Sequence, residues 1–488
     1  MEIFKNNNYV YNGIVLDKYQ TKVVKTKSSS SLVVAAAGSG KTFTICARID
    51  YLVKEKKVSP KKILCLSFTN ESVNDLKNSL LKNGLNIDVL TFHKFSLSIL
   101  KDKYKICSSD LLSYIIDEYF YSFIYFGKLN KLLDFYLEEE NINREFFLTN
   151  FKKVIYSFIN TFKSFGYDLQ KFLNIIYYCR NTNDKILLLI IFDVYNLYEE
   201  EKKSECKIDF NDMLLEAKKV ILEKKYFKYE YIIVDEYQDL SYVRYDLIHS
   251  IVGKTSCNFM AVGDDYQSIY SFSGSYVSLF TKFKRYFRKS KIFKLKMTFR
   301  NPKDIVDISS RFVLQNKGQI KKRLKSFNYV KQSINIVYTD NPLETFKNIC
   351  ENIDNIMVLS RNKKDILEIL DNEVSIDDKK IIYKDKDITY LTVHSAKGLE
   401  SNYVIILNCI DDVLGFPNKI REDELIKYLK RDSDNIDEER RLFYVALTRC
   451  KKKVFIFTVK NKESIYIKEL LRKYKYKINI MNLDNKKY

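Results

Sequence analysis

The sequence predicts an α/β protein with two parallel sheets and a helical segment inserted into the first half of the chain. Short β-branched or apolar runs, each followed by a polar turn and a helical pattern, occur in two groups. This alternation is typical of βα units with buried parallel strands. With 488 residues, the chain is long enough to form two or more domains.

Each group of apolar runs predicts the strands of one sheet. The runs are bounded by polar or glycine-containing turns, where short buried strands commonly end. The first group comprises SLVVAAAG (31–38), KILCLSFTN (62–70), YIIVDE (231–236) and NFMAVGDD (258–265). The second group comprises NIMVLSRN (355–362), ITYLTVHS (388–395), YVIILN (403–408) and KVFIFTV (453–459).

A long stretch between the second and third runs has helical periodicity and no clear strand. It is rich in Tyr, Phe, Leu and Lys, as in LLSYIIDEYFYSFIYF, and this pattern favours packed helices. We therefore expect a first domain made of residues 1–93 and 208–290, a helical insert at 94–207, and a second domain at 291–488.

The charge balance is strongly basic. The chain has 83 Lys and Arg against 62 Asp and Glu, which gives a net charge of +21. Such a surface attracts polyanions through counterion release, and nucleic acid is the natural candidate. A chain rich in Lys, Asn, Ile and Tyr can also carry its excess lysine as ordinary solvated surface, so charge alone leaves both interpretations open.

Several classes of protein are disfavoured. No apolar run approaches the roughly 20 residues that span a bilayer, so we expect no membrane association. The N-terminal MEIFKNNNYVYNG lacks the layout of a secretory signal, which favours a reducing cytoplasmic location. The nine cysteines contain no CxxC pair, so we expect free thiols and neither a zinc site nor an iron–sulfur cluster.

The run that opens the first group leads directly into AAAGSGKT (35–42). Gly38 and Gly40 let the chain curl so that backbone N–H groups and a helix N-terminus face an anion. Lys41 would neutralise nucleotide phosphates and Thr42 would offer its hydroxyl to Mg²⁺, although Ala35 replaces the leading glycine of the general pattern. The pattern predicts an ATP site that contains Ala37, Gly38, Ser39, Gly40, Lys41 and Thr42.

An acidic pair follows the third run of the first group. Asp235 and Glu236 stand at the end of YIIVDE, where an isolated pair of carboxylates would most simply be a solvated turn. Together with Lys41 they favour another interpretation, because a phosphate loop needs an acid to hold Mg²⁺ and a group to position the attacking water. The candidate metal ligands are thus Thr42 and Asp235.

Ten sequence blocks follow one another in order along nearly the whole chain. The blocks are LDKYQTKVV (16–24), AAAGSGKT (35–42), LSFTNESVNDL (66–76), TFHKF (91–95), IDFNDMLLEA (208–217), VDEYQD (234–239), VGDDYQSIYSFSG (262–274), MTFRN (297–301), LTVHSAKGLE (391–400) and EERRLFYVALTR (438–449). Together they resemble the motif set of superfamily 1 helicases of the UvrD/Rep/PcrA type. This resemblance implies two RecA-like domains, ATP with Mg²⁺ as cofactors, and single-stranded DNA as the partner.

The resemblance also implies roles for residues of the ATP site. Gln20 matches an adenine-reading glutamine, Phe299 a ring that stacks on the base, and Glu400 the residue that holds the ribose. Arg300 and Arg449 match two arginine fingers, for which ordinary ion pairs are the plain alternative. The catalytic set implied by the resemblance is Lys41, Asp235, Glu236, Gln267, Arg300 and Arg449, with Glu236 as base or positioner of water and Gln267 at the γ-phosphate.

The resemblance places a single-stranded DNA track across the tops of both sheets, where bases can stack on aromatic rings. A chain with 37 Tyr and 33 Phe puts many rings into cores, so core packing is the alternative for each aromatic residue. Phe68 and Phe272 are the foremost candidates. The full implied set is Phe68, Thr69, Asn70, Thr91, His93, Tyr270, Phe272, Thr392 and His394.

The chain departs from the family pattern at three places. Phe272–Ser273 stands where relatives have Trp–Arg, which keeps a stacking ring and loses a cation. Only a short segment separates LSRN from LTVHSAKG, so the helical 2B subdomain that larger relatives insert there is absent or vestigial. Few residues follow Arg449, which leaves no room for the nuclease domain of recombination relatives.

We therefore expect an ATP-dependent translocase or helicase that moves 3′ to 5′ on single-stranded DNA. One alternative is a DNA- or nucleotide-sensing ATPase subunit of a multi-protein nuclease complex, as in Gabija-type anti-phage systems. A non-enzymatic DNA-binding scaffold and a metabolic P-loop kinase explain fewer of the motifs. Repair, replication restart, plasmid maintenance and defence all remain open as the biological role.

Overall fold

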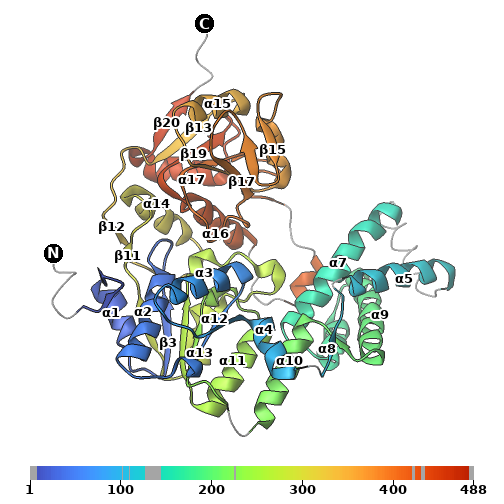
Figure 1. The fold of residues 1–488 in the computed structure, drawn as a ribbon. Helices are drawn as coiled ribbons and strands as arrows, with labels where there is room; N and C mark the ends of the chain where they lie inside the picture. The colour runs from blue at the N-terminus through green and yellow to red at the C-terminus, as the bar shows by residue number, and fades with distance from the viewer. Residues whose placement is uncertain are drawn as a thin grey trace.

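The computed structural model describes residues 8–101, 103–108, 110–126, 144–224, 227–419, 424–429 and 435–482. The fold has three parts (Figure 1). A first lobe lies at the lower left, a second lobe lies above it, and a bundle of helices projects to the right. We call these parts the first lobe, the second lobe and the insert.

The first lobe is built on a fully parallel six-stranded sheet with the order β10-β3-β9-β8-β4-β5. The predicted parallel α/β architecture is confirmed. All four predicted strands are present, and two further strands lie at the edges of the sheet. The strands are β3 (Ser30–Val34), β4 (Ile63–Ser67), β5 (Asp88–Thr91), β8 (Tyr231–Val234), β9 (Asn258–Gly263) and β10 (Lys291–Lys294).

Helices cover both faces of this sheet, which explains why its central strands are almost wholly apolar. Alternate residues of one strand enter different cores, since Leu32 and Val34 of β3 face one layer and Val33 faces the other. One layer contains α1 (Lys18–Val24), α2 (Lys41–Lys54) and α3 (Asn70–Leu81). The opposite layer contains α4 (Phe92–Leu100), α10 (Phe210–Glu223), α11 (Tyr242–Thr255), α12 (Ser278–Thr281) and α13 (Phe283–Tyr286).

The second lobe is built on an eight-stranded sheet with the order β15-β16-β17-β14-β18-β19-β13-β20. Its strands are parallel except in the β15–β16–β17 meander. The strands are β13 (Ile334–Tyr338), β14 (Ile356–Ser360), β15 (Ser375–Asp377), β16 (Lys380–Ile382), β17 (Ile388–Thr392), β18 (Ser401–Ile406), β19 (Cys450–Thr458) and β20 (Asn479–Asn482). Its helices are α14 (Lys303–Val313), α15 (Pro342–Glu351), α16 (Asn435–Leu447) and α17 (Ile465–Tyr474).

The segment between β14 and β17 contains no helical subdomain. It consists of a 3₁₀ helix, η5 (Lys363–Ile369), followed by the β15–β16 hairpin.

The insert has its own apolar core. Its helices are α5 (Leu111–Phe126), α7 (Arg144–Ser164), α8 (Leu169–Tyr178) and α9 (Thr182–Ser204). A two-residue parallel pairing of β6 (Lys105–Ile106) with β7 (Lys207–Ile208) joins its two ends, although we expected no strand in this region.

Two of the three internal boundaries expected for the first domain differ from those of the first-lobe sheet and its helices. The side chain of Phe95 in α4 is fully buried in the first-lobe core, so the chain leaves this lobe only after α4 rather than at residue 94. Strand β10 pairs with β3, so the first sheet continues to Lys294, past the boundary expected at residue 290. The sequence of β10, KIFK, did not predict a strand, because lysines flank its single apolar pair.

A buried ionic cluster joins the insert to the first lobe. Lys163 of α7 lies 2.6 Å from Glu199, 2.7 Å from Asp209 and 2.8 Å from Asp212. Lys202 of α9 contacts the same three carboxylates at 2.5–3.2 Å. The two lysine side chains are only 6% and 3% exposed, so two buried cations share three carboxylates beside the start of α10.

Replacing Lys163 by Met should destabilise this junction by about 3 kcal/mol, because the substitution leaves three partly buried carboxylates with one cation in place of two. Urea unfolding followed by circular dichroism measures the loss. Lys152 of the same helix is the matched control, since its pair with Asp117 is exposed. Lys152→Met should cost less than about 1 kcal/mol, and equal losses for both variants would contradict the expectation.

Candidate nucleotide cleft and nucleic-acid track

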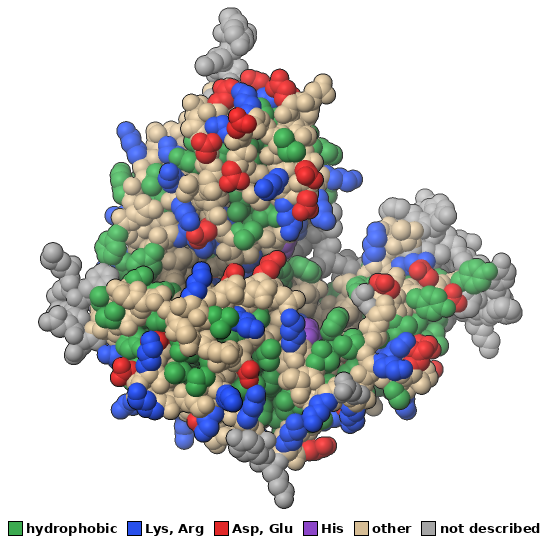
Figure 2. All heavy atoms as spheres, viewed as in Figure 1, with side chains coloured by type: hydrophobic (Ala, Val, Ile, Leu, Met, Phe, Trp, Pro, Cys, Tyr) green, Lys and Arg blue, Asp and Glu red, His purple; other side chains and the backbone are tan. Residues whose placement is uncertain are grey.

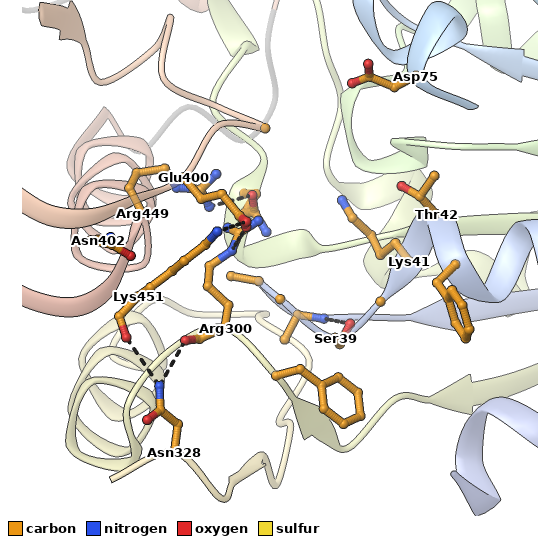
Figure 3. A pocket seen from close by; sticks show the side chains of 18 of the residues that line it. Ser39, Lys41, Thr42, Asp75, Arg300, Asn328, Glu400, Asn402, Arg449 and Lys451 are labelled. Atoms are coloured by element: carbon orange, nitrogen blue, oxygen red, sulfur yellow. Dashed lines mark hydrogen bonds and ion pairs between the residues drawn. The ribbon is translucent and has the colours of Figure 1, made fainter. Parts of the chain in front are cut away.

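The phosphate loop connects β3 to α2. Gly38 and Gly40 have φ values of +68° and +74°, in the left-handed region that favours glycine. The loop is fixed from within, because the Ala36 N–H donates to Ser39 Oγ at 3.1 Å. The turn directs the N-terminus of α2, which begins at Lys41, toward the interior of a cleft (Figure 3).

The second-lobe side of the cleft touches this loop directly. The Phe299 N–H donates to the Gly38 carbonyl at 2.9 Å, and the Thr298 hydroxyl donates to the Ala37 carbonyl at 2.8 Å. A Cβ atom on Gly38 would overlap Cβ of Arg300 and would lie 2.8 Å from the Thr298 hydroxyl. Only glycine permits this approach, so the loop and the segment that carries Arg300 are fitted to each other.

Gln20 supports the loop from behind. Asp17 caps α1 by accepting from the Gln20 backbone at 2.9 Å, and the Asp17 N–H donates to the Gln20 side-chain oxygen at 3.2 Å. The Gln20 amide nitrogen lies 3.4 Å from the Ser39 carbonyl as a long hydrogen bond. Gln20 is 4% exposed and is not among the residues that line the cleft.

A cleft of about 940 Å³ lies between the lobes. The predicted catalytic residues come from both lobes, and all six line this one cavity, as do Thr42, Phe299 and Glu400. Figure 3 shows Lys41 and Thr42 on one wall and Arg300, Glu400 and Arg449 on the other. The lining residues that we had not predicted include Asp75, Asn328, Asn402 and Lys451.

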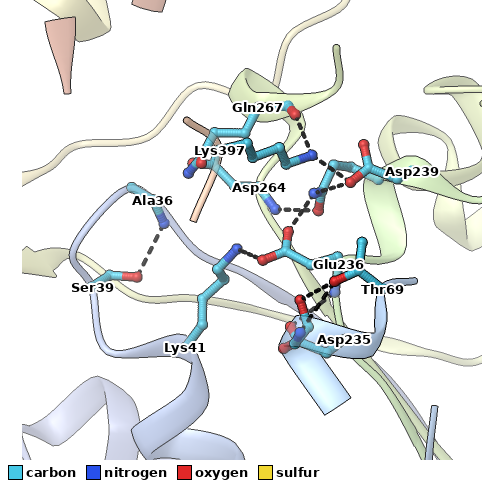
Figure 4. Close-up of polar contacts among 12 residues, drawn as sticks. Ala36, Ser39, Lys41, Thr69, Asp235, Glu236, Asp239, Asp264, Gln267 and Lys397 are labelled. Atoms are coloured by element: carbon cyan, nitrogen blue, oxygen red, sulfur yellow. Dashed lines mark hydrogen bonds and ion pairs between the residues drawn. The ribbon is translucent and has the colours of Figure 1, made fainter. Parts of the chain in front are cut away.

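The acidic pair lies at the end of β8, beside Lys41. Glu236 has a φ of +50°, and this turn aims its carboxylate at Lys41, whose Nζ lies 2.5 Å from Glu236 Oε1 (Figure 4). Gln238 donates to the other Glu236 oxygen at 2.5 Å. Burial opposes ionisation of Glu236, yet the charges of Lys41 and Lys397 lower its pKa to about 2. Burial, reinforced by the Glu236 charge, raises the pKa of Asp235 to about 6.

Gln267 connects an acidic residue of the first lobe, Asp264, to Arg449 of the second lobe. Its amide donates to Asp264 Oδ2 at 2.6 Å, and its side-chain oxygen accepts from Arg449 Nη2 at 3.2 Å. Arg449 is fully buried. Burial, and the nearby charge of Arg300, lower the pKa of Arg449 to about 9, so this guanidinium is still charged at neutral pH.

Arg300, Glu400 and Lys451 form an ionic chain on the second-lobe wall. Glu400 forms ion pairs with both cations: Arg300 Nε and Lys451 Nζ each lie 2.6 Å from one of its carboxylate oxygens. Burial opposes ionisation of Glu400, but these two cations lower its pKa. The ring of Phe299 at the same edge of the cleft is 56% exposed, which leaves its face open to a planar ligand.

Lys397 is a residue that we did not predict. It forms an ion pair with Asp239, donates to the Gln267 carbonyl at 2.8 Å, and lies 4.7 Å from the centre of the Tyr270 ring. One second-lobe cation thus contacts both a buried acid of the first lobe, Asp239, and an aromatic residue outside the cleft, Tyr270. The block LTVHSAKGLE contains this lysine, so its place in the motif was the available signal.

A row of aromatic rings begins next to Lys397. Phe68 and Tyr270 stack with centroids 5.8 Å apart and an interplanar angle of 12°. Phe272 makes edge contacts with Tyr270 at 5.9 Å and with His394 at 5.7 Å, and it is 55% exposed. We call Phe68, Tyr270, Phe272 and His394 the aromatic row; it contains residues of both lobes.

The other predicted DNA residues lie at the ends of strands of the two sheets. Thr69 and Thr91 are N-caps, which accept from Ser72 and Lys94 at 3.1 and 3.2 Å, and Asn70 is exposed at the start of α3. Thr392 shares a hydrogen bond with Ser395. His93 contacts Phe210, a half-exposed ring that we did not predict.

Both histidines in this region are neutral at physiological pH. Burial, with Arg244 nearby, lowers the pKa of His93 to about 4. Burial, with Arg361 and Lys397 nearby, does the same for His394. These rings therefore present aromatic faces and hydrogen-bonding nitrogens rather than positive charge.

A glycine-bent loop at the end of a parallel strand faces an acidic pair and the guanidinium groups of a second parallel-sheet lobe. This geometry defines the class of two-lobed P-loop nucleotide hydrolases. Residues 16–288 match the UvrD/REP helicase N-terminal domain, and residues 341–461 match the UvrD-like helicase C-terminal domain. The first match covers more than half of the chain, so the chain belongs to the UvrD/Rep family of DNA helicases.

Several curated helicases are similar to this chain. DNA helicase IV of Escherichia coli (strain K12) is 26% identical, over 93% of this chain and 70% of that protein. ATP-dependent DNA helicase Rep of Buchnera aphidicola subsp. Baizongia pistaciae and ATP-dependent DNA helicase PcrA of Bacillus subtilis (strain 168) are each 28% identical. The chain spans only 45% and 42% of the lengths of these last two proteins.

Within the described ranges, no helix has the length and apolarity that a membrane crossing requires. In the same ranges, one cluster of three potential metal-ligating carboxylates occurs, Glu199, Asp209 and Asp212, and it is already paired with the two buried lysines.

Replacing Gly38 by Ala should lower ATP turnover by about 100-fold, because displacement of the catalytic groups by even 1 Å is costly. The added Cβ would separate the loop from Arg300. Steady-state ATP hydrolysis measures the effect. Gly318→Ala is the control for backbone strain, since Gly318 has a φ of +85° but no atom near a new Cβ. If the two variants lose activity equally, overlap of the new Cβ with Arg300 is not the cause of the loss.

Proposed function

We propose that this protein is an ATP-dependent translocase on single-stranded DNA that moves 3′ to 5′ and can act as a DNA helicase. The observation that carries the proposal is the convergence of Lys41, Asp235, Glu236, Gln267, Arg300 and Arg449 on one interlobe cleft. The 3′ to 5′ polarity is inferred from the family motifs.

The chain's own residues suit ATP. The glycine-bent loop and the start of α2 present backbone N–H groups to phosphate oxygens, and Lys41 supplies the cation. Phosphate groups entering the loop would compete with Glu236 for this ammonium and release the carboxylate to position water. The exposed Phe299 ring offers a stacking surface for a base, while Gln20 would act at the loop rather than inside the cleft.

Thr42 and Asp235 are the candidate Mg²⁺ ligands. Asp235 is buried beside Glu236, and the raised pKa of its carboxyl group is the mark of a site with too few cations for its acids. A divalent ion held there would neutralise charge on the phosphate oxygens. Arg300 and Arg449 would stabilise the remaining negative charge from the second lobe.

The aromatic row suits single-stranded DNA. Unstacked bases can lie on aromatic faces with little regard to sequence, and neutral histidines fit such a surface. Lys397 links the row to the cleft, because it contacts Tyr270, Asp239 and the Gln267 backbone. A change in lobe separation during ATP turnover would therefore be transmitted to the rings that hold the bases.

A second candidate function keeps the motor site and changes the task. Between β14 and β17 stand only η5 and the β15–β16 hairpin, so the chain lacks a helical subdomain that could act on a duplex from that position. This favours a DNA-sensing ATPase that works with a nuclease or another subunit. A duplex-unwinding assay, with and without such a partner, distinguishes the two candidates.

Single-stranded DNA should increase the rate of ATP hydrolysis by the purified protein, and Lys41→Ala should abolish turnover with and without DNA, because the phosphates lose their cation. A coupled ATPase assay measures both effects. The absence of DNA stimulation in the unmodified protein, together with unchanged turnover in the variant, would refute the proposal.

Phe272→Ala should weaken binding of single-stranded DNA by about 1–3 kcal/mol, the usual value for loss of one base-stacking ring. Fluorescence anisotropy with a labelled oligonucleotide measures the affinity. Tyr476→Ala is the matched control, since Tyr476 is an aromatic residue that is 76% exposed and lies outside the aromatic row. Equal affinities for the two variants would remove Phe272 from the DNA track.

A further inference from the structure

A short helix of the second lobe's chain is buried in the insert. This is η6 (Glu424–Tyr428), which lies between β18 and α16 in sequence and appears in orange-red beside α7 in Figure 1. Leu425, Ile426 and Leu429 are 2%, 4% and 2% exposed and belong to the core formed by the insert helices. The second-lobe chain thus contributes to a core that is otherwise made by residues of the insert.

Polar contacts fix the position of η6 on the insert. The Tyr428 hydroxyl donates to Asp184 Oδ2 at 2.6 Å and accepts from Cys179 Sγ at 3.3 Å. Lys427 Nζ lies 3.0 Å from the same Asp184 oxygen, and the Tyr167 hydroxyl donates to the Leu429 carbonyl at 3.4 Å. These contacts involve α8, α9 and the loop before α8, so the docking is specific as well as apolar.

The chain on both sides of η6 is anchored to the second lobe. The Asn418 N–H donates to Glu439 Oε2 at 3.0 Å, and Arg361 of the second lobe pairs with Glu439 at 2.8 Å. Glu439 belongs to α16, which follows η6 in the chain. Because the insert is continuous with the first lobe, the η6 contact completes a closed circuit of first lobe, insert, η6 and second lobe.

The turn that carries Phe272 contacts both the second lobe and the insert. It contacts α16 on one side, where the Ser271 N–H donates to Glu438 at 3.0 Å. On its other side Gly274 is packed against Ser164 of α7, so closely that a Cβ would overlap the serine side chain. Figure 2 shows a hollow between the two lobes and the insert, with histidine side chains visible inside it.

We propose that docking of η6 on the insert closes a ring of protein around single-stranded DNA bound along the aromatic row. The inference rests on the proposed function, because it needs DNA at the row. A strand with a free end can thread through the closed ring. A circular strand can enter only when η6 leaves the insert, so η6 acts as a clasp that controls loading and retention.

Locking the clasp tests the proposal. Lys427→Cys and Asp184→Cys place thiols on the two sides of the contact, and Cys206→Ser removes the cysteine that is exposed; a short bismaleimide then joins the pair. The locked protein should hydrolyse ATP with linear oligonucleotides as the unlocked double-cysteine protein does, but circular single-stranded DNA should no longer stimulate it.

Each other result has a distinct meaning. Full stimulation of the locked protein by circular DNA would overturn the ring, and so would loss of stimulation by linear DNA on locking alone. If the unmodified protein responds to neither form, the proposed function itself fails rather than the clasp.

Opening the clasp gives an independent test. Ile426→Asp places a charge in the apolar contact, and Tyr428→Phe removes two hydrogen bonds with little risk to folding. Protein preloaded on circular single-stranded DNA should dissociate about tenfold faster with Ile426→Asp, in a competitor-trap assay, and Tyr428→Phe should shift the rate in the same direction. Tyr177→Ser, at a 76% exposed residue of α8, is the control. Unchanged residence of both clasp variants would overturn the proposal.

Discussion

The close approach of the phosphate loop to the second-lobe segment Met297–Arg300 is the contact on which the rest of the site depends. It requires a glycine at position 38, both for its positive φ and for the absence of a side chain where Arg300 passes. Because Phe299 and Thr298 also donate to the loop, the loop and an arginine of the other lobe form one fitted unit. The distance between the lobes is thereby tied to the shape of the nucleotide site.

A second set of contacts links that unit to the outside of the cleft. Gln267 holds Arg449, and Lys397 holds both the Gln267 backbone and Asp239 while it lies over Tyr270. The charges in this network are buried, where electrostatic interactions are strong and solvent screens them little. A rearrangement around Gln267 should therefore move Lys397, and through Lys397 the ring of Tyr270 in the aromatic row.

Much of the architecture follows from local pattern, and the exceptions have physical reasons. Strands β3, β4, β8 and β9 are covered on both faces, so they are recognisable as apolar runs. Strands β5 and β10 lie at sheet edges and carry charged residues, so the same criterion missed them. The packing of α4 on the first lobe was also not predicted, because the apolar pattern of a helix does not indicate whether it packs on the first lobe or on the insert.

The cleft was more predictable than its surroundings. Each motif residue at the end of a strand points to one edge of a sheet, so Lys41 and Asp235 could be placed together in advance. Gln20 differs, because its amide is used by Asp17 and the loop backbone rather than by the cavity. The docking of Leu425 and Ile426 could not be foreseen, since a short apolar pair does not indicate which surface will cover it.

The burial of Lys163 and Lys202 among three acids has a practical consequence for handling the protein. Phosphate contacts on an open surface weaken steeply as ionic strength rises, whereas ion pairs shielded from water are screened far less. Concentrated salt should therefore remove nucleic acid from the protein during purification while the insert stays docked on the first lobe.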